Sequence, residues 1–238
     1  MGRGTDWLPV ASHCADRFYC LLPDLPGHGD NFNLPASQPL DFDLMADGVD
    51  RLIGQLKLGA VHLAGYSMGG RIALYTALKH PQRVKSLILE GSSPGIQADQ
   101  ARHERAALDD QHALRLQAEG MAAFIEDWYN MPLFQSLHRY PQLLHRVKQQ
   151  RKQNDPGWMA KIISQLSPGR QPSLWPDLGA LAVPVLLIAG ALDLKYSELA
   201  IAMAQQIPRA TVKIIPDSGH NVHLERPAEF AELLVTDL

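Results

Sequence analysis

The chain has 238 residues, of which 46 % are apolar, and its formal net charge at pH 7 is −3. This length suits one large globular domain or one domain with an insertion, and the slight acidity argues against nucleic acid as a partner. Two cysteines are too few for a disulfide scaffold. The longest apolar run, from Leu181 to Ala189, is about half as long as a membrane span. We therefore expect a cytoplasmic protein that binds neither membranes nor nucleic acid.

Five short runs rich in leucine or β-branched residues predict strands. In chain order they are Phe18–Leu22, Ala60–Ala64, Val84–Leu89, Val183–Ala189 and Thr211–Ile215. Segments with helical spacing lie between them, for example the apolar residues from Leu44 to Leu56. Alternating strands and helices predict an α/β protein whose mostly parallel sheet carries helices on both faces.

This alternation stops between Gly95 and Gly179, where only helical patterns occur. They cover Ala101–Gln117, Gly120–Asn130, Tyr140–Lys152 and Trp158–Leu166. Pro132, Pro141 and Pro156 stand between these patterns, where helices start or stop. We predict a core built from residues 1–94 and 180–238 and a helical lid formed by residues 95–179.

The segment Gly65-Tyr66-Ser67-Met68-Gly69 fits the G-x-S-x-G pattern of a serine on a sharp turn between a strand and a helix. It follows a predicted strand and precedes the helical pattern Arg71–Leu78, which is the context that the pattern requires. Its glycines allow strand and helix to approach without Cβ clashes. We predict that Ser67 is catalytic, rather than part of a glycine–serine turn without chemistry.

A serine hydroxyl needs a base to take its proton, and a histidine oriented by a carboxylate is the usual base. Asp193 follows the apolar run that ends at residue 189, and His220 follows the last predicted strand, where α/β sheets place their sites. The order Ser67, Asp193, His220 is the one found in the α/β-hydrolase architecture. His223 and Asp217 stay open as weaker alternatives. The spacing of acids and histidines fits no metal site.

Two arginines of the predicted lid need a partner. Arg151 continues the apolar stripe of Tyr140, Leu144 and Val147 at helical spacing, so we expect it to point inward. Arg105 shares a face with its neighbours Ala101 and Leu108 and is expected inward as well. A buried arginine needs an anion, which is either a protein carboxylate or a ligand. Trp128, taken alone, fits a core position better than a ligand contact.

Motifs along nearly the whole chain resemble those of one family. They are Asp24–Gly29, Gly65–Arg71, Leu87–Ile96, Asp127–Leu137, Gly190–Tyr196 and Ser218–Pro227. Together they resemble the 2-succinyl-6-hydroxy-2,4-cyclohexadiene-1-carboxylate synthases of menaquinone biosynthesis, which have the α/β-hydrolase fold. The tyrosine before the serine, the arginine after it and the Asp-Trp-Tyr segment are more specific than the serine motif.

The resemblance implies a lyase without a cofactor that eliminates pyruvate from 2-succinyl-5-enolpyruvyl-6-hydroxy-3-cyclohexene-1-carboxylate. It implies that Ser67, deprotonated through His220 and Asp193, is a general base and takes the α-proton of this substrate. The backbone N–H of Met68 would face the developing oxyanion.

The same resemblance implies the substrate-binding residues. Arg71, Arg105 and Arg151 would bind carboxylates of a small polyanionic substrate, and Tyr66 and Trp128 would line the pocket. A monomer is the simplest expectation, although the sequence itself does not determine the oligomeric state.

Two other functions stay open. A carboxylesterase or C–C hydrolase would use Ser67 as a nucleophile, but the three arginines argue against neutral acyl substrates. An inactive ligand-binding protein would be expected to lack a member of the triad, and all three members are present; its remaining ground is the loss of N-terminal strands.

The resemblance also implies that N-terminal strands are missing. In this fold a His-Gly dipeptide ends the strand before Phe18–Leu22, and the next backbone N–H completes the oxyanion hole. No such dipeptide precedes Phe18. The absent strand would lie between Phe18–Leu22 and Ala60–Ala64. We expect the 238-residue chain to be poorly stable and nearly inactive, because burying one apolar strand contributes about as much free energy as keeps a domain folded.

Overall fold

Four parallel strands form the sheet of this protein, whose computed structural model describes residues 1–35 and 37–237. In sheet order they are β1 (Val61–Tyr66), β2 (Val84–Glu90), β3 (Val185–Gly190) and β4 (Ala210–Ile215). Each neighbouring pair is parallel and in register along most of its length. Their carboxyl ends therefore meet at one edge of the sheet, and the predicted parallel sheet is confirmed.

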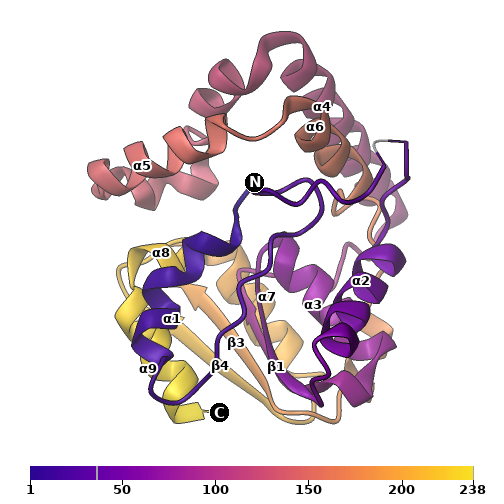
Figure 1. The fold of residues 1–238 in the computed structure, drawn as a ribbon, viewed down its shortest axis with the longest axis vertical. Coiled ribbons are helices and arrows are strands. Elements are labelled where there is room, and N and C mark those ends of the chain that lie inside the picture. The colour runs from indigo at the N-terminus through magenta and orange to yellow at the C-terminus, as the bar shows by residue number, and fades with distance from the viewer. Residues whose placement is uncertain (36, 238) are drawn as a thin grey trace.

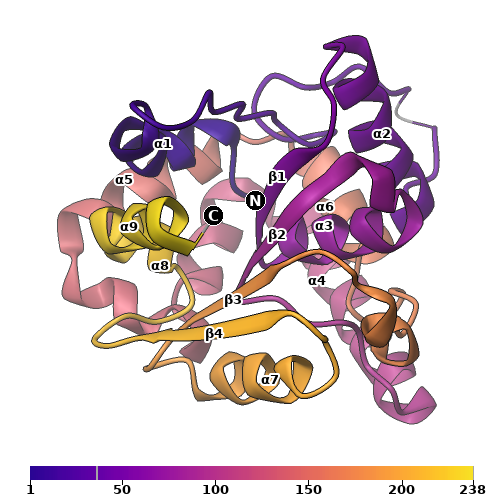
Figure 2. The same ribbon diagram turned by 90° about the horizontal axis from the view of Figure 1, so that it is seen from below.

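Helices cover both faces of this sheet (Figure 2). On one face lie α3 (Met68–Lys79) and α7 (Leu194–Ala204), and on the other lie α1 (Leu8–Cys14) and α9 (Pro227–Asp237). The helix α2 (Phe42–Gln55) packs against α3. Successive residues of β2 point to opposite faces, so that Leu87 contacts the α3 and α7 side and Ile88 contacts the α1 and α9 side. Burial on both faces explains why the central strands are continuous apolar runs.

The segment Phe18–Leu22, predicted as a strand, is not a strand. Tyr19 is 90 % exposed and Leu21 is 43 % exposed, and Phe18 packs its ring 5.5 Å from that of His62. A strand exists only where a neighbouring backbone accepts and donates its hydrogen bonds. Among the described residues, β1 forms its backbone pairing with β2. Residues of β1 and of Phe18–Leu22 line the same cavity instead of pairing with each other. The further strand predicted between the two segments stays a prediction.

Residues 95–179, which we call the helical insertion, lie beyond the carboxyl ends of the strands (Figure 1). The insertion contains α4 (Asp99–Trp128), α5 (Pro141–Lys152), α6 (Pro156–Gln165) and the 3₁₀ helices η3 (Pro132–Arg139) and, at its end, η4 (Trp175–Ala180). Gly120, with φ of 78°, divides α4 into the two helical patterns that the sequence predicts. Pro132, Pro141 and Pro156 each begin a helix, where the missing N–H of proline costs nothing.

An apolar cluster joins the insertion to the core. Phe42 of α2 and Ile72 of α3 belong to the same buried cluster as Leu116, Phe124 and Met159 of the insertion. The remaining short elements are η1 (Gly4–Trp7), η2 (Pro81–Arg83) and α8 (Val222–Glu225). Within residues 1–35 and 37–237, no helix has the length and apolarity that crossing a membrane requires.

Candidate active site

Ser67 occupies a strained turn between β1 and α3. Its φ of 49° and ψ of −111° are unfavourable for a residue with a side chain. A Cβ atom at Gly65 would collide with the Gly69 carbonyl, and one at Gly70 would collide with the hydroxyl of Ser92. These glycines therefore allow the strand and the helix to meet closely enough to present Ser67 at the edge of the sheet.

The structure brings Ser67, His220 and Asp193 together as a hydrogen-bonded chain. His220 Nε2 lies 3.1 Å from Ser67 Oγ, and His220 Nδ1 lies 2.6 Å from Asp193 Oδ2. His220 is 2 % exposed and Asp193 is 8 % exposed, so the histidine–aspartate pair is shielded from water. Asp193 also accepts a hydrogen bond from the Tyr196 N–H at the start of α7. It caps a helix and orients a histidine at the same time.

The two alternatives to these residues have other partners, although His223 lines the same cavity. His223 Nδ1 is 3.0 Å from Oε1 of the fully buried Glu90, and its ring stacks on Trp7. Asp217 is exposed and lies beside Arg139. Neither contacts Ser67. The sequence analysis did not single out Glu90, although its position at the end of β2 was a signal.

Ser67 and His220 open onto a cavity of about 1060 Å³. All of the site residues predicted from the sequence line it, namely Ser67, Asp193, His220, Met68, Tyr66, Arg71, Arg105, Trp128 and Arg151. Met68 is the first residue of α3, so its N–H has no acceptor within the helix. That N–H is therefore suited to an anionic oxygen beside Ser67.

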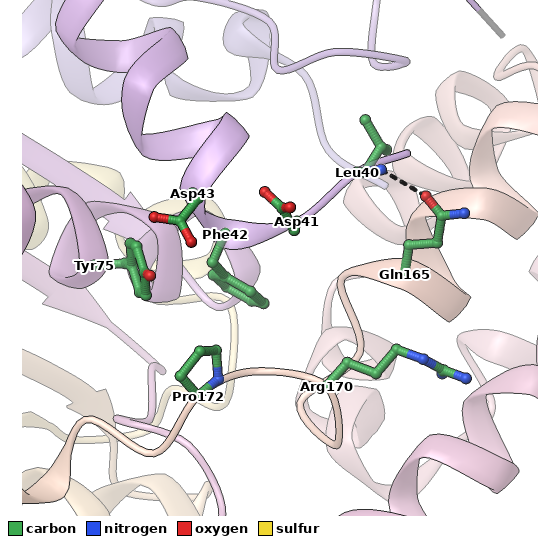
Figure 3. A pocket seen from close by; sticks show the side chains of 8 residues that line it. All are labelled: Leu40, Asp41, Phe42, Asp43, Tyr75, Gln165, Arg170 and Pro172. Atoms are coloured by element: carbon green, nitrogen blue, oxygen red, sulfur yellow. Dashed lines mark hydrogen bonds between the residues drawn. The ribbon is translucent and has the colours of Figure 1, made fainter. Parts of the chain in front are cut away.

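A second hollow, of about 240 Å³, lies between the start of α2 and the segment after α6 (Figure 3). Its wall includes Phe42, Tyr75, Arg170 and Pro172. It contains no residue of the hydrogen-bonded chain at Ser67. No group of three or more potential metal ligands occurs in the part of the chain that the structure describes.

Tyr66 stands beside His220. Its ring centroid is 5.1 Å from that of His220, and its hydroxyl accepts a hydrogen bond of 2.8 Å from the Asn221 amide. Burial raises the pKa of Tyr66 well above its ordinary value, so the hydroxyl keeps its proton. Tyr196, which was not predicted from the sequence, also packs against this histidine, with its ring 4.6 Å from that of His220.

Arg71 is a buried cation that has no carboxylate partner among the described residues. It is 8 % exposed, and its Nη1 donates a hydrogen bond of 3.3 Å to Gln171 Oε1. Its guanidinium carbon lies 5.4 Å from the centre of the Phe42 ring. Burial lowers the pKa of Arg71 to about 10, which still leaves it charged at neutral pH. Among the described residues no carboxylate forms an ion pair with it, although the buried Asp109 acts on it from farther away and raises its pKa; in this sense its positive charge is uncompensated.

Arg105 is compensated within the protein. Its Nε donates to Asp109 Oδ2 at 2.8 Å, and Asp109, which is 2 % exposed, also accepts from the Ser167 hydroxyl. The face predicted for Arg105 is wrong, because Ala101 and Leu108 are exposed. The relevant neighbour is the aspartate one helical turn along, which the sequence analysis missed.

Arg151 is also compensated. It donates to both carboxylate oxygens of Asp6, at 3.2 Å and 2.5 Å, and the two side chains are only 4 % and 5 % exposed. The inward stripe predicted for it is confirmed, because Leu144 and Val147 are buried beside it. Asp6 is 145 positions away in the chain, and no local pattern could have found it.

Trp128 serves both roles that the sequence left open. Its ring stacks on that of Phe124 at a centroid distance of 5.3 Å, within the apolar cluster of the insertion. It is also half-buried and lines the cavity. The side chain therefore has both an apolar body in the core and a surface that a ligand could contact.

Comparison with known proteins gives concordant matches. Residues 2–227 match the family model of the alpha/beta hydrolase fold. The chain is similar to 2-succinyl-6-hydroxy-2,4-cyclohexadiene-1-carboxylate synthase of Serratia proteamaculans, with 34 % identity over 97 % of this chain and 87 % of that protein. It is 33 % identical to Protein PHYLLO, chloroplastic, of Arabidopsis thaliana over 95 % of its own length, but spans only 14 % of that protein.

Two solved structures extend these matches. MenH from S. aureus superimposes with a TM-score of 0.94 and 35 % identity, covering 98 % of this chain and 88 % of that one. A thermophilic esterase from Thermogutta terrifontis, solved with malate bound, superimposes with a TM-score of 0.86 and 27 % identity, covering 98 % of this chain and 84 % of that one.

Proposed function

This chain belongs to the alpha/beta hydrolase fold family and, within it, to the 2-succinyl-6-hydroxy-2,4-cyclohexadiene-1-carboxylate synthases, and on that basis we propose its reaction. The enzyme is a cytoplasmic, monomeric lyase of menaquinone biosynthesis. It eliminates pyruvate from 2-succinyl-5-enolpyruvyl-6-hydroxy-3-cyclohexene-1-carboxylate. The observation that carries the proposal is the uncompensated cation of Arg71 in the same cavity wall as the Ser67–His220 pair.

Ser67 acts as a base in this reaction. His220 Nε2 takes the proton of Ser67 Oγ, and Asp193 stabilises the resulting imidazolium through its hydrogen bond to Nδ1. The serine oxygen then takes the α-proton of the substrate. The electron pair of that C–H bond shifts through the ring and breaks the C–O bond to the enolpyruvyl group. The departing enolate of pyruvate takes a proton that His220 returns, and no bond forms between Ser67 and carbon.

Negative charge develops on the substrate when the α-proton leaves. The N–H of Met68 and the amino end of α3 face the region beside Ser67, where they stabilise such a charge. Because these groups are fixed before the substrate arrives, they need no reorganisation during the reaction.

The arginines bind the substrate's carboxylates with different strengths. Arg71 offers an unpaired charge, whereas Arg105 and Arg151 share theirs with Asp109 and Asp6. A charge-assisted hydrogen bond contributes about 1.5–3 kcal/mol, and Arg71 provides the largest share because no carboxylate of the described residues forms an ion pair with it.

We further propose that the helical insertion, residues 95–179, is a lid. It supplies Arg105 and Trp128 from α4 and Arg151 from α5, so that a large part of the substrate-binding surface arrives with it. Water would be excluded when it closes over the carboxyl ends of the strands.

The test is to incubate the protein with the enolpyruvyl cyclohexene substrate and to follow pyruvate with lactate dehydrogenase and NADH. Pyruvate release that Ser67→Ala abolishes supports the lyase. The second candidate, an esterase, is favoured by the similarity to the Thermogutta enzyme. Rapid turnover of p-nitrophenyl esters, without pyruvate release, would establish that candidate instead.

A further inference from the structure

Gln171 connects the helical insertion to the arginine beside the catalytic serine. Its side chain is fully buried, and its Oε1 accepts the 3.3 Å hydrogen bond from Arg71 Nη1, which lies 100 positions earlier in the chain. Its Nε2 donates to the Ser93 carbonyl at 3.4 Å. The loop that carries its neighbours Arg170 and Pro172 runs from α6 past Phe42 (Figure 3). Both polar atoms of the Gln171 amide therefore form hydrogen bonds, and one of these bonds orients the guanidinium of Arg71.

The residue type at position 171 determines whether the charge of Arg71 in the cavity wall is paired within the protein. Arg105 and Arg151 each face a buried carboxylate, so their charges are neutralised inside the protein. Gln171 occupies the corresponding place beside Arg71 but is neutral. The Phe42 ring, whose face attracts the guanidinium, is neutral as well. Arg71 is thus oriented by neutral partners and keeps its charge for a ligand.

We propose that Gln171 is a positioning and specificity-determining residue. It orients Arg71 and, because it has no charge, leaves that arginine free to bind a carboxylate of the substrate. This inference rests on the proposed function, since it assigns a role in binding the same anionic substrate. Gln171 acts through Arg71, so its contribution belongs to binding in both the ground state and the transition state. Its loss should appear in KM and leave kcat nearly unchanged.

Gln171→Glu tests this directly, because it keeps the size and the acceptor toward Arg71 and adds one negative charge there, while it also removes the N–H that donates to the Ser93 carbonyl. We expect KM for the enolpyruvyl substrate to rise at least ~10-fold and kcat to change less than ~3-fold. The matched control is Gln165→Glu. Gln165 Oε1 accepts from the Leu40 N–H at 2.7 Å, shown as the dashed line in Figure 3. The same charge added there should leave KM within ~2-fold of the starting value.

A binding measurement separates this inference from the proposed reaction. Succinate is the probe, because it presents carboxylates without being turned over. Millimolar succinate should raise the melting temperature of the unaltered protein and of Gln165→Glu, and it should not raise that of Gln171→Glu. If neither the 238-residue protein nor a form extended by the expected N-terminal strand releases pyruvate, the proposed function fails, and the succinate result still decides the role of Gln171.

Two results would overturn the inference. The first is a folded Gln171→Glu protein whose KM and whose stabilisation by succinate are both unchanged. This result would overturn the inference even if the unaltered protein releases pyruvate normally. The second concerns Gln171→Met, which removes the acceptor without adding a charge and serves if Gln171→Glu does not fold. We expect its KM to rise ~3-fold or more, and an unchanged KM would contradict the positioning of Arg71 by the amide.

Discussion

Ser67 Oγ and His220 Nε2 lie 3.1 Å apart, although 153 positions separate the two residues in the chain. Such a contact between a hydroxyl and a buried imidazole has a direct consequence for catalysis. We expect Ser67→Ala, His220→Ala and Asp193→Asn each to lower pyruvate release at least ~10³-fold, because the three act as one unit. The losses should be strongly non-additive in the double variants. A Ser67→Ala protein that retained a tenth of the activity would rule out Ser67 as the base.

Arg71→Ala removes the uncompensated charge from the cavity. We expect the fall in kcat/KM for pyruvate release to correspond to a loss of about 2–4 kcal/mol of transition-state stabilisation. Turnover of a small neutral ester, if measurable, should hardly change. The matched control is Arg83→Ala, because Arg83 of η2 pairs with Asp50 of α2 and neither residue lines the cavity. Equal losses on both substrates would mean that Arg71 supports the fold instead.

The buried pair of Arg151 and Asp6 should be strongly coupled in stability. Removing either partner leaves the other charge buried without a counter-charge, which costs about 3–5 kcal/mol of unfolding free energy. We therefore expect Asp6→Ala and Arg151→Ala each to be destabilising and the double variant to lose much less than their sum. Urea denaturation of all four proteins measures this coupling.

An exposed ion pair provides the comparison for this double-mutant cycle of Asp6 and Arg151. Arg115 and Glu119, whose side chains are 35 % and 43 % exposed, lie 2.8 Å apart on one face of α4. Their coupling energy should stay below about 1 kcal/mol. Additive losses at Asp6 and Arg151 would show that the pair contributes no more than this surface pair does.

His28 should make the protein sensitive to acid. Burial lowers the pKa of His28 to about 3, whereas an unfolded chain has a histidine pKa near 6.5. Below pH 6.5 the unfolded state therefore takes up a proton that the folded state does not bind. The contribution of His28 to stability is complete above that pH and falls as the pH drops toward 3, by at most about 1.4 kcal/mol per pH unit.

Urea denaturation between pH 7 and pH 4 checks this for His28→Phe, which does not titrate. Its free energy of unfolding should depend less steeply on pH than that of the unaltered protein. The difference between the two slopes should correspond to the uptake of up to one proton on unfolding. The exposed His145 on α5 provides the control, since His145→Phe should leave the slope as it was. An identical slope for His28→Phe would contradict the assignment.

The sequence predicts those parts of the molecule that depend on neighbours along the chain. The turn at Ser67, four of the strands, and the prolines that begin helices all follow from local patterns. Phe18–Leu22 fails because a strand is defined by a partner, and its apolar pattern says nothing about whether a partner exists. The triad was predictable because each member lies in the turn or loop that follows a strand, and the carboxyl ends of the strands meet at one edge of the sheet.

The partners of the arginines were much harder to predict. Asp109 could have been predicted as the partner of Arg105, because the two are four residues apart on one helix. Asp6 and Gln171, by contrast, lie 145 and 100 positions from the arginines they contact. Only tertiary packing brings them together. Which arginine keeps its charge therefore became visible only in the structure.

The central claim is that Ser67 removes a proton and forms no bond to the substrate carbon. Intact-mass spectrometry during turnover, combined with the measurement of pyruvate, tests it most directly. We predict one pyruvate released for each cyclohexadiene product formed, with the mass of the protein unchanged at every time point. Accumulation of a covalent adduct on Ser67 during turnover of this substrate, or its consumption without pyruvate, would contradict the account.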